Sequence, residues 1–260
     1  MKPMRWANAT SVEIDEVLGN MEAAILPVGA TEQHGPHLGC GTDFVIAEEL
    51  CAAVSAATGV PMLPVLPYGC SLGHSRQWPG TISLLPETLM DLVEQIVDWA
   101  HSAGVLRMFI VNAHVTNAAP LRCAVERLRA RHNDLMLAIV NTATMTTRVR
   151  DAFCADAEDW HANEAETSLM QAISSALVRP ELFSMADDPD RTTSSVFIHP
   201  VNRTSRNGVT GRPSISSLER GQILFDWMIE DLTDIVRRGL VETPPLDVPY
   251  NPVDSRPSTL

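Results

Sequence analysis

Short apolar runs alternate along the first half of the chain with longer segments whose apolar residues recur at helical spacing. The runs at residues 23–28, 62–66, 105–111 and 135–140 have the length and composition of buried strands. The helical spacing covers residues 43–57, 86–103 and 117–132. Strands that alternate with helices form crossover units, in which helices cover a parallel sheet. We therefore expect an α/β fold, a three-layer α/β/α sandwich with a mostly parallel central sheet.

Two prolines lie inside the apolar runs, at Pro27 and Pro64. Because proline lacks the backbone donor that a sheet ladder uses, each should lie at a strand end, a bulge or an unpaired edge.

The second half of the chain is less regular. Helices are expected at residues 163–177 and 216–238, separated by a long polar stretch at 186–213. A loop of that length usually serves function or assembly, so we expect it to cover the site or to form an oligomer contact. The proline-rich segment 241–260 is expected to be an extended or disordered tail after a single domain at residues 1–240.

Charge and cysteine content exclude several classes of protein. A formal net charge of -13 makes nucleic acid and anionic membranes poor partners, since both require clustered cations. Five cysteines, an odd number without a CxxC pair, do not fit a secreted disulfide framework. Neither an export signal nor a membrane span is expected from the apolar runs, so we expect a cytoplasmic protein.

Side chains typical of metal ligands follow the first apolar run. Glu32 and His34 are two residues apart, so an extended backbone turns both to one side, and Asp43 lies at the start of the next helix. Such mixed oxygen and nitrogen ligands suit Zn²⁺, Mn²⁺ or Fe²⁺, and Asp43 can bridge two ions. Alternatively, Asp43 with Thr42 only caps the helix and the histidines are surface residues.

Three further candidate residues lie far along the chain. His114 follows the third apolar run, and His161 and Glu166 lie at the entrance to the helix expected at 163–177. The alternative for His114 is an ordinary polar residue. The alternative for the acidic residues is a first turn favoured by the helix dipole, which we prefer for Glu164.

Together these motifs resemble, in order, the motif set of the creatininase family, whose members include creatinine amidohydrolase, formamide-cleaving deformylases and a peptidase that trims a peptide-derived redox cofactor. The similarity runs from about residue 23 to 238, and its motifs are Glu32-Gln-His34-Gly35-Pro36-His37, Thr42-Asp43, Trp78-Pro79-Gly80-Thr81, Asn112-Ala113-His114, Glu166-Thr167-Ser168 and Gly208-Val-Thr-Gly211-Arg-Pro213.

The resemblance implies an α/β/α fold, one or two divalent metal ions per subunit, and a homo-oligomer, often a hexamer. It makes Glu32 and His34 ligands to different ions, with Asp43 bridging them and His114 joining the ion of Glu32. A metal-activated water would attack the substrate carbonyl. The resemblance also makes His161 the proton donor to the departing nitrogen.

The chain departs from the family pattern at two positions. Thr116 stands where creatininases have a glutamate, so Glu166 is the candidate carboxylate for the second ion. Ala113 replaces the usual glycine before the histidine. Both departures make creatinine a weak guess for the substrate.

Substrate contacts are expected from the loop after the second apolar run and from the segment before Glu166. The candidates are Ser71, His74, Arg76, Gln77, Trp78 and Trp160. Arg76 could pair with a substrate carboxylate, or it could be a surface or intersubunit residue. His37 could orient a ligand or shuttle protons as part of the catalytic set, although stabilising a turn is an equal alternative.

The sequence thus predicts a metal-dependent amidohydrolase that cleaves a C–N bond of a small cyclic amide, lactam or formamide. The alternatives are a metallopeptidase acting on a short peptide, a non-catalytic metal-binding oligomeric module, and a thiol hydrolase using Cys40 or Cys154. Structural metal sites are usually closed by cysteines, which argues against the module.

Overall fold

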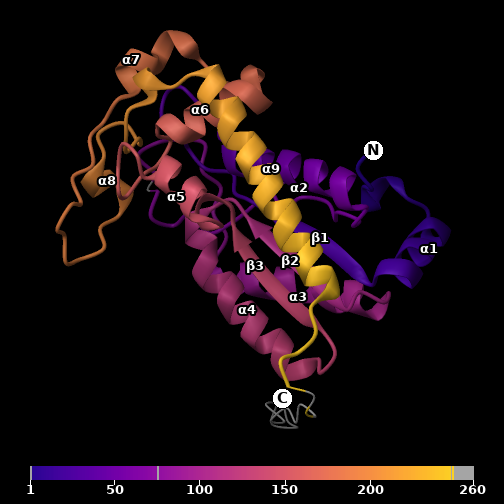
Figure 1. Cartoon of the computed structure of the whole chain (residues 1–260). Helices are drawn as coiled ribbons and strands as arrows, with labels where there is room; N and C mark the ends of the chain where they lie inside the picture. The colour runs from indigo at the N-terminus through magenta and orange to yellow at the C-terminus, as the bar shows by residue number, and fades with distance from the viewer. Residues whose placement is uncertain (1, 75, 247, 249–260) are drawn as a thin grey trace.

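Three parallel strands form the centre of the protein in the computed structural model, which describes residues 2–74, 76–246 and 248. Within these residues the strand order is β1 (Ala23–Val28), β2 (Arg107–Asn112) and β3 (Met136–Asn141). The register pairs the first residues of all three strands, Ala23 with Arg107 and Arg107 with Met136. The predicted parallel α/β architecture is confirmed (Figure 1).

The strand predicted at residues 62–66 is wrong as a continuous strand. This segment follows β1 only through isolated bridges, Ile25 with Met62 and Val28 with Leu66. Prolines at 61, 64 and 67 remove backbone donors that a ladder would need. The carbonyl of Pro27 accepts a hydrogen bond from the Leu66 amide. The N–H that Pro27 lacks would therefore have faced this irregular edge, which agrees with the expectation for Pro27.

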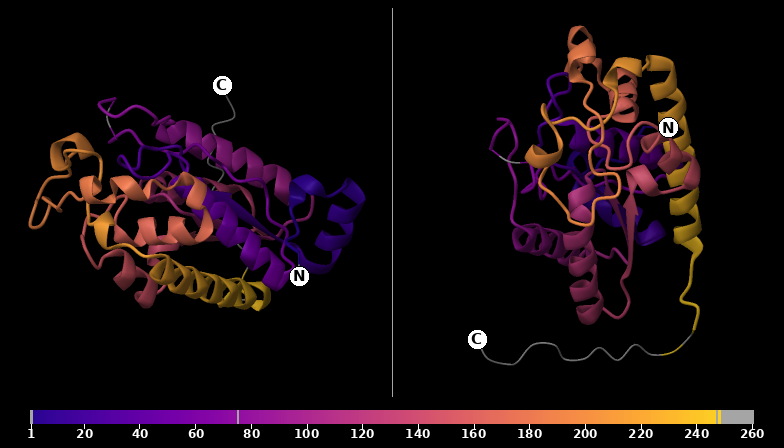
Figure 2. Two further views of the ribbon diagram at one scale, coloured as in Figure 1. Left: turned by 90° about the horizontal axis from the view of Figure 1, so that it is seen from above. Right: turned by 90° about the vertical axis from the view of Figure 1, so that its left-hand side faces the viewer.

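Helices cover both faces of the sheet. Successive residues of a strand point to opposite faces, and because the strands are apolar on both faces, each face needs a covering layer. Ile25 and Val111 pack with residues of α2 (Thr42–Thr58), α6 (Glu164–Ile173) and α9 (Leu218–Val241). Leu26 and Ile110 pack with α1 (Ser11–Met21), α3 (Pro86–Ser102) and α4 (Ala118–Arg131). Seen from above, α9 and α3 lie on opposite sides of the strands (Figure 2, left). Two separate apolar cores therefore sandwich the sheet.

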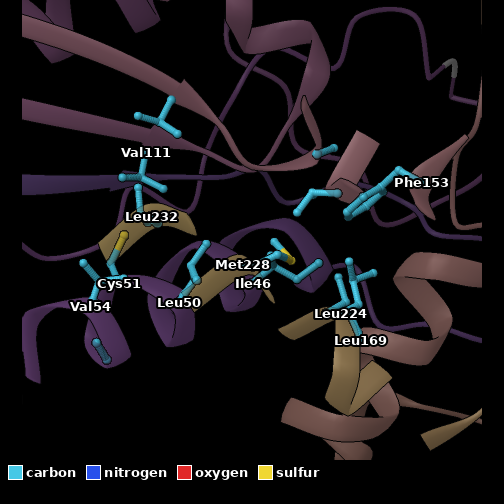
Figure 3. Packing of buried hydrophobic residues seen from close by; sticks show 14 of the residues in the cluster. Ile46, Leu50, Cys51, Val54, Val111, Phe153, Leu169, Leu224, Met228 and Leu232 are labelled. Atoms are coloured by element: carbon cyan, nitrogen blue, oxygen red, sulfur yellow. The ribbon is translucent and has the colours of Figure 1, made fainter. Parts of the chain in front are cut away.

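The core on the α9 side joins three helices to β2. Figure 3 shows Val111 of β2 beside Leu232 of α9, with Leu50 of α2 close by and Leu169 of α6 further along. These side chains are all fully or almost fully buried. The core holds the start of α2 and the start of α6 on one side of the sheet, and both helix starts carry predicted site residues.

The remaining helices are short: α5 (Thr147–Phe153), α7 (Phe183–Ala186) and α8 (Val201–Thr204). The helix predicted at 163–177 ends earlier, at Ile173, and the last helix extends three residues beyond its predicted end, to Val241. Most of the predicted tail lies outside the described residues, so the tail and the domain division stay predictions. No helix within the described ranges is long and apolar enough to span a membrane.

Candidate metal centre

All five predicted metal ligands meet at the carboxyl edge of the sheet. Glu32 and His34 lie in the loop after β1, and His114 lies in the turn after β2. Asp43 is in the first turn of α2, and Glu166 is in the first turn of α6. All five are buried, with exposed fractions between 0% and 5%. This is the edge at which parallel sheets generally bind ligands.

Close packing between β1 and α2 places Asp43. A Cβ atom at Gly29 would lie 2.4 Å from the backbone nitrogen and Cα of Phe44, so only glycine allows the helix to start so close to the strand end. The first turn of α2 is thereby held directly against the loop that carries Glu32 and His34.

An asparagine builds the turn that presents His114. The Asn112 side chain accepts a hydrogen bond from the His114 amide (3.2 Å) and donates one to the His114 carbonyl (2.8 Å). It also donates to Asn141 at the end of β3 and accepts from Asn117. This network shapes the turn although Ala113 replaces the expected glycine.

The helix cap of α6 orients Glu166. Asn163 is the N-cap residue, and its side-chain oxygen accepts from the Glu166 amide. Glu166 Oε2 accepts from the backbone N–H of Ala162 at 2.6 Å. Its other oxygen, Oε1, lies 3.7 Å from His34 Nε2. One oxygen is thus held by the backbone while the other faces the cluster.

The five residues form two groups that share Asp43. The first comprises Glu32, Asp43 and His114, and the second comprises His34, Asp43 and Glu166; within each group the ligand atoms lie within 4.8 Å of one another. Asp43 Oδ1 is 3.2 Å from His34 Nε2, and Asp43 Oδ2 is 3.2 Å from His114 Nδ1. The two carboxylate oxygens therefore face different groups, as bridging would require.

Several of these buried atoms have no hydrogen-bond partner among the described residues, which is unusual in a folded protein. They are both carboxylate oxygens of Glu32, Nε2 of His34 and Oδ2 of Asp43. Lone pairs of oxygen and nitrogen atoms that converge in a buried space fit a divalent cation, whose charge would offset the three carboxylates.

The electrostatics of the cluster point the same way. Burial raises the pKa of Glu32 to about 7. Burial would lower the pKa of His114, but Glu32 and Asp43 outweigh it and raise the pKa to about 9. The pKa of His34 is likewise raised well above its usual value by Asp43 and Glu166, against the effect of burial. The buried carboxylates therefore favour positive charge at this place, which a bound cation would supply.

Two further histidines border Glu32. His74 Nε2 lies 3.1 Å from Glu32 Oε1, and His161 Nδ1 lies 3.5 Å from the same oxygen. The His161 ring contacts the rings of His34 and His74, with centroids 4.5 Å apart in both pairs. Burial lowers the pKa of His74 to about 3 and that of His161 well below its usual value. Both rings are therefore neutral near pH 7.

Of the other predicted site residues, Ser71 also reaches the cluster. Its hydroxyl lies 3.2 Å from His114 Nε2, which is 2.8 Å from the Cys70 carbonyl. His37 is buried behind the cluster, and its Nε2 lies 2.8 Å from the hydroxyl of Thr167, the neighbour of Glu166.

Three predicted substrate residues have no direct link to the cluster. Arg76 is exposed, Trp78 is half-buried, and Trp160 packs against Phe153 with ring centroids 4.8 Å apart. Within the described chain, none of the three makes a hydrogen bond, ion pair or ring contact with the candidate ligands. Their role in binding substrate stays a prediction.

Glu164 faces away from the cluster. It forms an ion pair with Arg220 of α9 at 2.9 Å and accepts from the Ser168 hydroxyl at 2.6 Å. Both residues border a cavity of about 480 Å³ between α5, α6 and α9, on the other side of α6 from Glu166. This geometry agrees with the interpretation of Glu164 as a residue of the first helical turn and not as a metal ligand.

Sequence reasoning missed the role of Gln33, which lies between two candidate ligands and is 3% exposed. Its side chain hydrogen-bonds to Gly208 in the 186–213 segment and lies within hydrogen-bonding distance of His74 and His161. That segment also pairs with His161 through Thr210, so part of it does cover the site as expected. The one sequence feature that could have indicated this role is the position of Gln33 between the candidate ligands Glu32 and His34.

Fold and site together define an α/β protein with a buried cluster of metal-ligand side chains at the carboxyl edge of a parallel sheet. The profile of the creatininase family, described as creatinine amidohydrolase, matches residues 7–236. The chain therefore belongs to the creatininase family, and it is a hydrolase of that family.

Two curated relatives illustrate the range of the family. The chain is 31% identical over 236 residues to the mycofactocin precursor peptide peptidase of Mycobacterium tuberculosis, and the match covers 83% of this chain and 85% of that protein. It is 28% identical over 240 residues to the creatinine amidohydrolase of Pseudomonas putida, and that match covers 85% of this chain and 90% of that protein.

Solved creatininases share the fold. A creatininase (creatinine amidohydrolase) structure matches with a TM-score of 0.81 at 26% identity over 94% of this chain and 100% of that chain. A mutant creatininase of Zn-Zn type and a creatininase with Mn each match with a TM-score of 0.80 at 25% identity, over 93% of this chain and 100% of theirs.

Proposed function

We propose that this protein is a metal-dependent amidohydrolase that cleaves a C–N bond of a small cyclic amide, lactam or formamide. The observation that carries the proposal is the position of Asp43, whose two oxygens each face a separate group of buried ligand atoms. A purely structural role would not call for unpaired carboxylate and imidazole atoms in a shared buried space.

We assign Glu32, Asp43 and His114 to one ion, and His34, Asp43 and Glu166 to a second. The donor chemistry suits Zn²⁺, Mn²⁺ or Fe²⁺, and related creatininases of Zn-Zn type and with Mn support the first two. A bound cation would lower the pKa of a coordinated water to about 7 and polarise the scissile carbonyl.

The chain's own groups orient these ligands. His34 Nδ1 donates to the Glu32 carbonyl at 3.0 Å, which directs Nε2 towards Asp43 and Glu166. His114 Nε2 donates to the Cys70 carbonyl, which directs Nδ1 towards Asp43. Partners of this kind fix the tautomer and the ring plane of a ligating histidine.

His161 is the proposed proton carrier. It borders Glu32 and contacts the rings of His34 and His74. It lies outside the two groups that share Asp43, but with Glu32 and His34 it forms a third group of possible ligand atoms. A neutral imidazole at this place can accept a proton and later give it to the departing nitrogen.

The departure from the family pattern at residue 116 bears on the class of substrate. Thr116 stands where creatininases have a glutamate, which makes creatinine a weak choice and favours another small amide. A peptidase acting on a short peptide is the second candidate, because one relative at 31% identity is the mycofactocin precursor peptide peptidase. The same ligand cluster would serve either bond.

A hydrolysis screen tests the proposal. The purified protein, loaded with Zn²⁺ or Mn²⁺, is assayed against cyclic amides, lactams, formamides and short peptides, with and without a chelator. We expect turnover of a small amide that is lost on chelation and restored by metal, and absent in Asp43→Ala. Turnover that survives metal removal but is lost on thiol alkylation would instead favour a cysteine hydrolase.

A further inference from the structure

We propose that Gln33 is a positioning residue that sets the tautomers of His74 and His161, and thereby decides which of them presents a proton to the centre and which presents a lone pair. The inference rests on the proposed function only for its consequence for catalysis. The hydrogen-bond arrangement that carries it stands on the contacts of Gln33 itself.

The orientation of the Gln33 amide is fixed by a backbone donor. The N–H of Gly35 donates to Gln33 Oε1 at 2.9 Å, and a backbone N–H cannot pair with the NH₂ end of an amide. The NH₂ end therefore faces the other way, towards Gly208, His74 and His161.

Gln33 Nε2 has two hydrogens but three neighbours within hydrogen-bonding distance. These neighbours are the carbonyl of Gly208 at 3.0 Å, Nδ1 of His74 at 3.1 Å and Nε2 of His161 at 3.3 Å. His161 Nε2 also lies 2.9 Å from the backbone carbonyl of Gln33, which can only accept. His161 Nε2 must therefore carry a hydrogen, and the two amide hydrogens go to Gly208 and His74.

His74 then turns an N–H, rather than a lone pair, towards a candidate metal ligand. Its Nδ1 accepts from Gln33, so the hydrogen of the neutral ring is on Nε2, which lies 3.1 Å from Glu32 Oε1. This N–H lies beside Glu32 Oε1 without a hydrogen bond to it, and Glu32 Oε2 lies 3.2 Å from His114 Nε2, on the side of the first group. We therefore assign His74 to an electrostatic contact with Glu32 rather than to binding substrate.

His161 turns a lone pair, rather than an N–H, towards the cluster, although both rings carry their hydrogen on Nε2. Because its hydrogen is on Nε2 and donates to the Gln33 carbonyl, its Nδ1 carries a lone pair that faces the cluster, 3.5 Å from Glu32 Oε1. His161 must first accept a proton: an O–H bond of the attacking water breaks as an N–H bond forms at Nδ1. That proton then passes to the leaving nitrogen as the C–N bond breaks, so no external acid is needed.

Gly208 shows how tightly the amide is held. Its φ of +86° is a left-handed conformation, and a Cβ atom there would lie 2.1 Å from Gln33 Oε1. Any side chain at residue 208 would therefore displace the amide. The 186–213 segment is in this way coupled to the protonation pattern of the centre.

Nitrogen NMR of the histidine rings tests the proposal on the full-length protein, both zinc-loaded and metal-free. The signals are assigned by their loss in His74→Asn and His161→Asn. In the wild type we expect an unprotonated Nδ1 and a protonated Nε2 in His74. The metal-free His161 should show the same tautomer. Protonated Nδ1 in either ring of the metal-free wild type would overturn the proposal, whether or not any substrate is hydrolysed.

The variant Gln33→Glu keeps the acceptor for Gly35 but has no hydrogen to donate to His74. We expect protonation to appear at His74 Nδ1, with kcat reduced about 10- to 100-fold, the usual effect of losing a partner that orients metal ligands. The matched control is Gln95→Glu on the exposed face of α3, which should leave the ring signals unchanged. Unaltered His74 signals in Gln33→Glu would contradict the role assigned to Gln33.

Discussion

Glu166 Oε1 lies 3.7 Å from Nε2 of His34, although the two residues come from opposite halves of the chain. The other oxygen of Glu166 is held by the Ala162 amide, so the carboxylate faces His34 with one oxygen. This geometry places a carboxylate in the second group without the glutamate that Thr116 replaces.

The variant Glu166→Gln should therefore weaken the second ion. A neutral amide donates poorly to a cation, and we expect the affinity of one ion to fall about 10-fold or more, as is common around metal sites. Isothermal titration with Zn²⁺ measures this. Glu164→Gln, on the same helix but paired with Arg220, is the matched control and should bind metal like the wild type. Equal stoichiometry and affinity in Glu166→Gln would exclude Glu166 as a ligand.

The stability of the metal-free protein should fall as the pH rises from 7 to 8.5. The folded chain holds protons on His34 and His114 more tightly than the unfolded chain does, because their pKa values are raised, that of His114 to about 9. Where the folded state binds more protons, stability decreases with rising pH. Thermal unfolding at the two pH values should show this loss without metal, and a smaller loss with Zn²⁺. An equal loss of stability with and without Zn²⁺ would argue against protons on His34 and His114 in the metal-free protein.

Replacing Gly29 with alanine should disturb the start of α2. Its Cβ would lie 2.4 Å from the Phe44 backbone, so we expect a loss of about 1 to 3 kcal/mol in the free energy of unfolding and weaker metal binding through Asp43. Gly19→Ala is the control: no atom lies within 4 Å of its Cβ in helix α1, and stability should rise by about 0.5 to 1 kcal/mol. Chemical unfolding compares them. A neutral Gly29→Ala would mean that the strand and helix can separate freely.

Asp188 should anchor the segment at 186–213. It is buried, pairs through both oxygens with Arg191, and accepts from Ser205 and the Arg206 amide. Asp188→Asn should cost about 2 kcal/mol, since an amide cannot accept from all these donors. Faster proteolysis within 186–213 would accompany the loss. The exposed pair of Asp234 with Arg238 provides the control Asp234→Asn, with a change of about 0.5 kcal/mol or less. Equal effects would contradict the anchoring role.

The parallel architecture could be predicted because β1, β2 and β3 lie in short, mostly apolar runs that alternate with segments of helical spacing. The same reasoning failed at residues 62–66, where the composition suits a strand but three prolines leave only scattered bridges to β1. Composition says how buried a segment is, whereas the spacing of backbone donors decides whether it joins the sheet.

The convergence of the candidate ligands could be predicted because their side-chain chemistry and their order along the chain are both distinctive. The role of Gln33 could not, since it depends on how an amide, two imidazoles and the Gly208 carbonyl share a limited number of hydrogens in space. For the same reason, sequence alone suggested His74 as a substrate contact, while the structure places it against Glu32.

The most direct test is Zn²⁺ titration of the metal-free protein compared with Asp43→Ala. Because Asp43 faces both groups, the wild type should bind two ions per chain, and the variant should lose tight binding while its circular dichroism spectrum stays that of the folded protein. Wild-type protein that binds no more Zn²⁺ than Asp43→Ala would contradict the metal centre and, with it, the proposed hydrolysis.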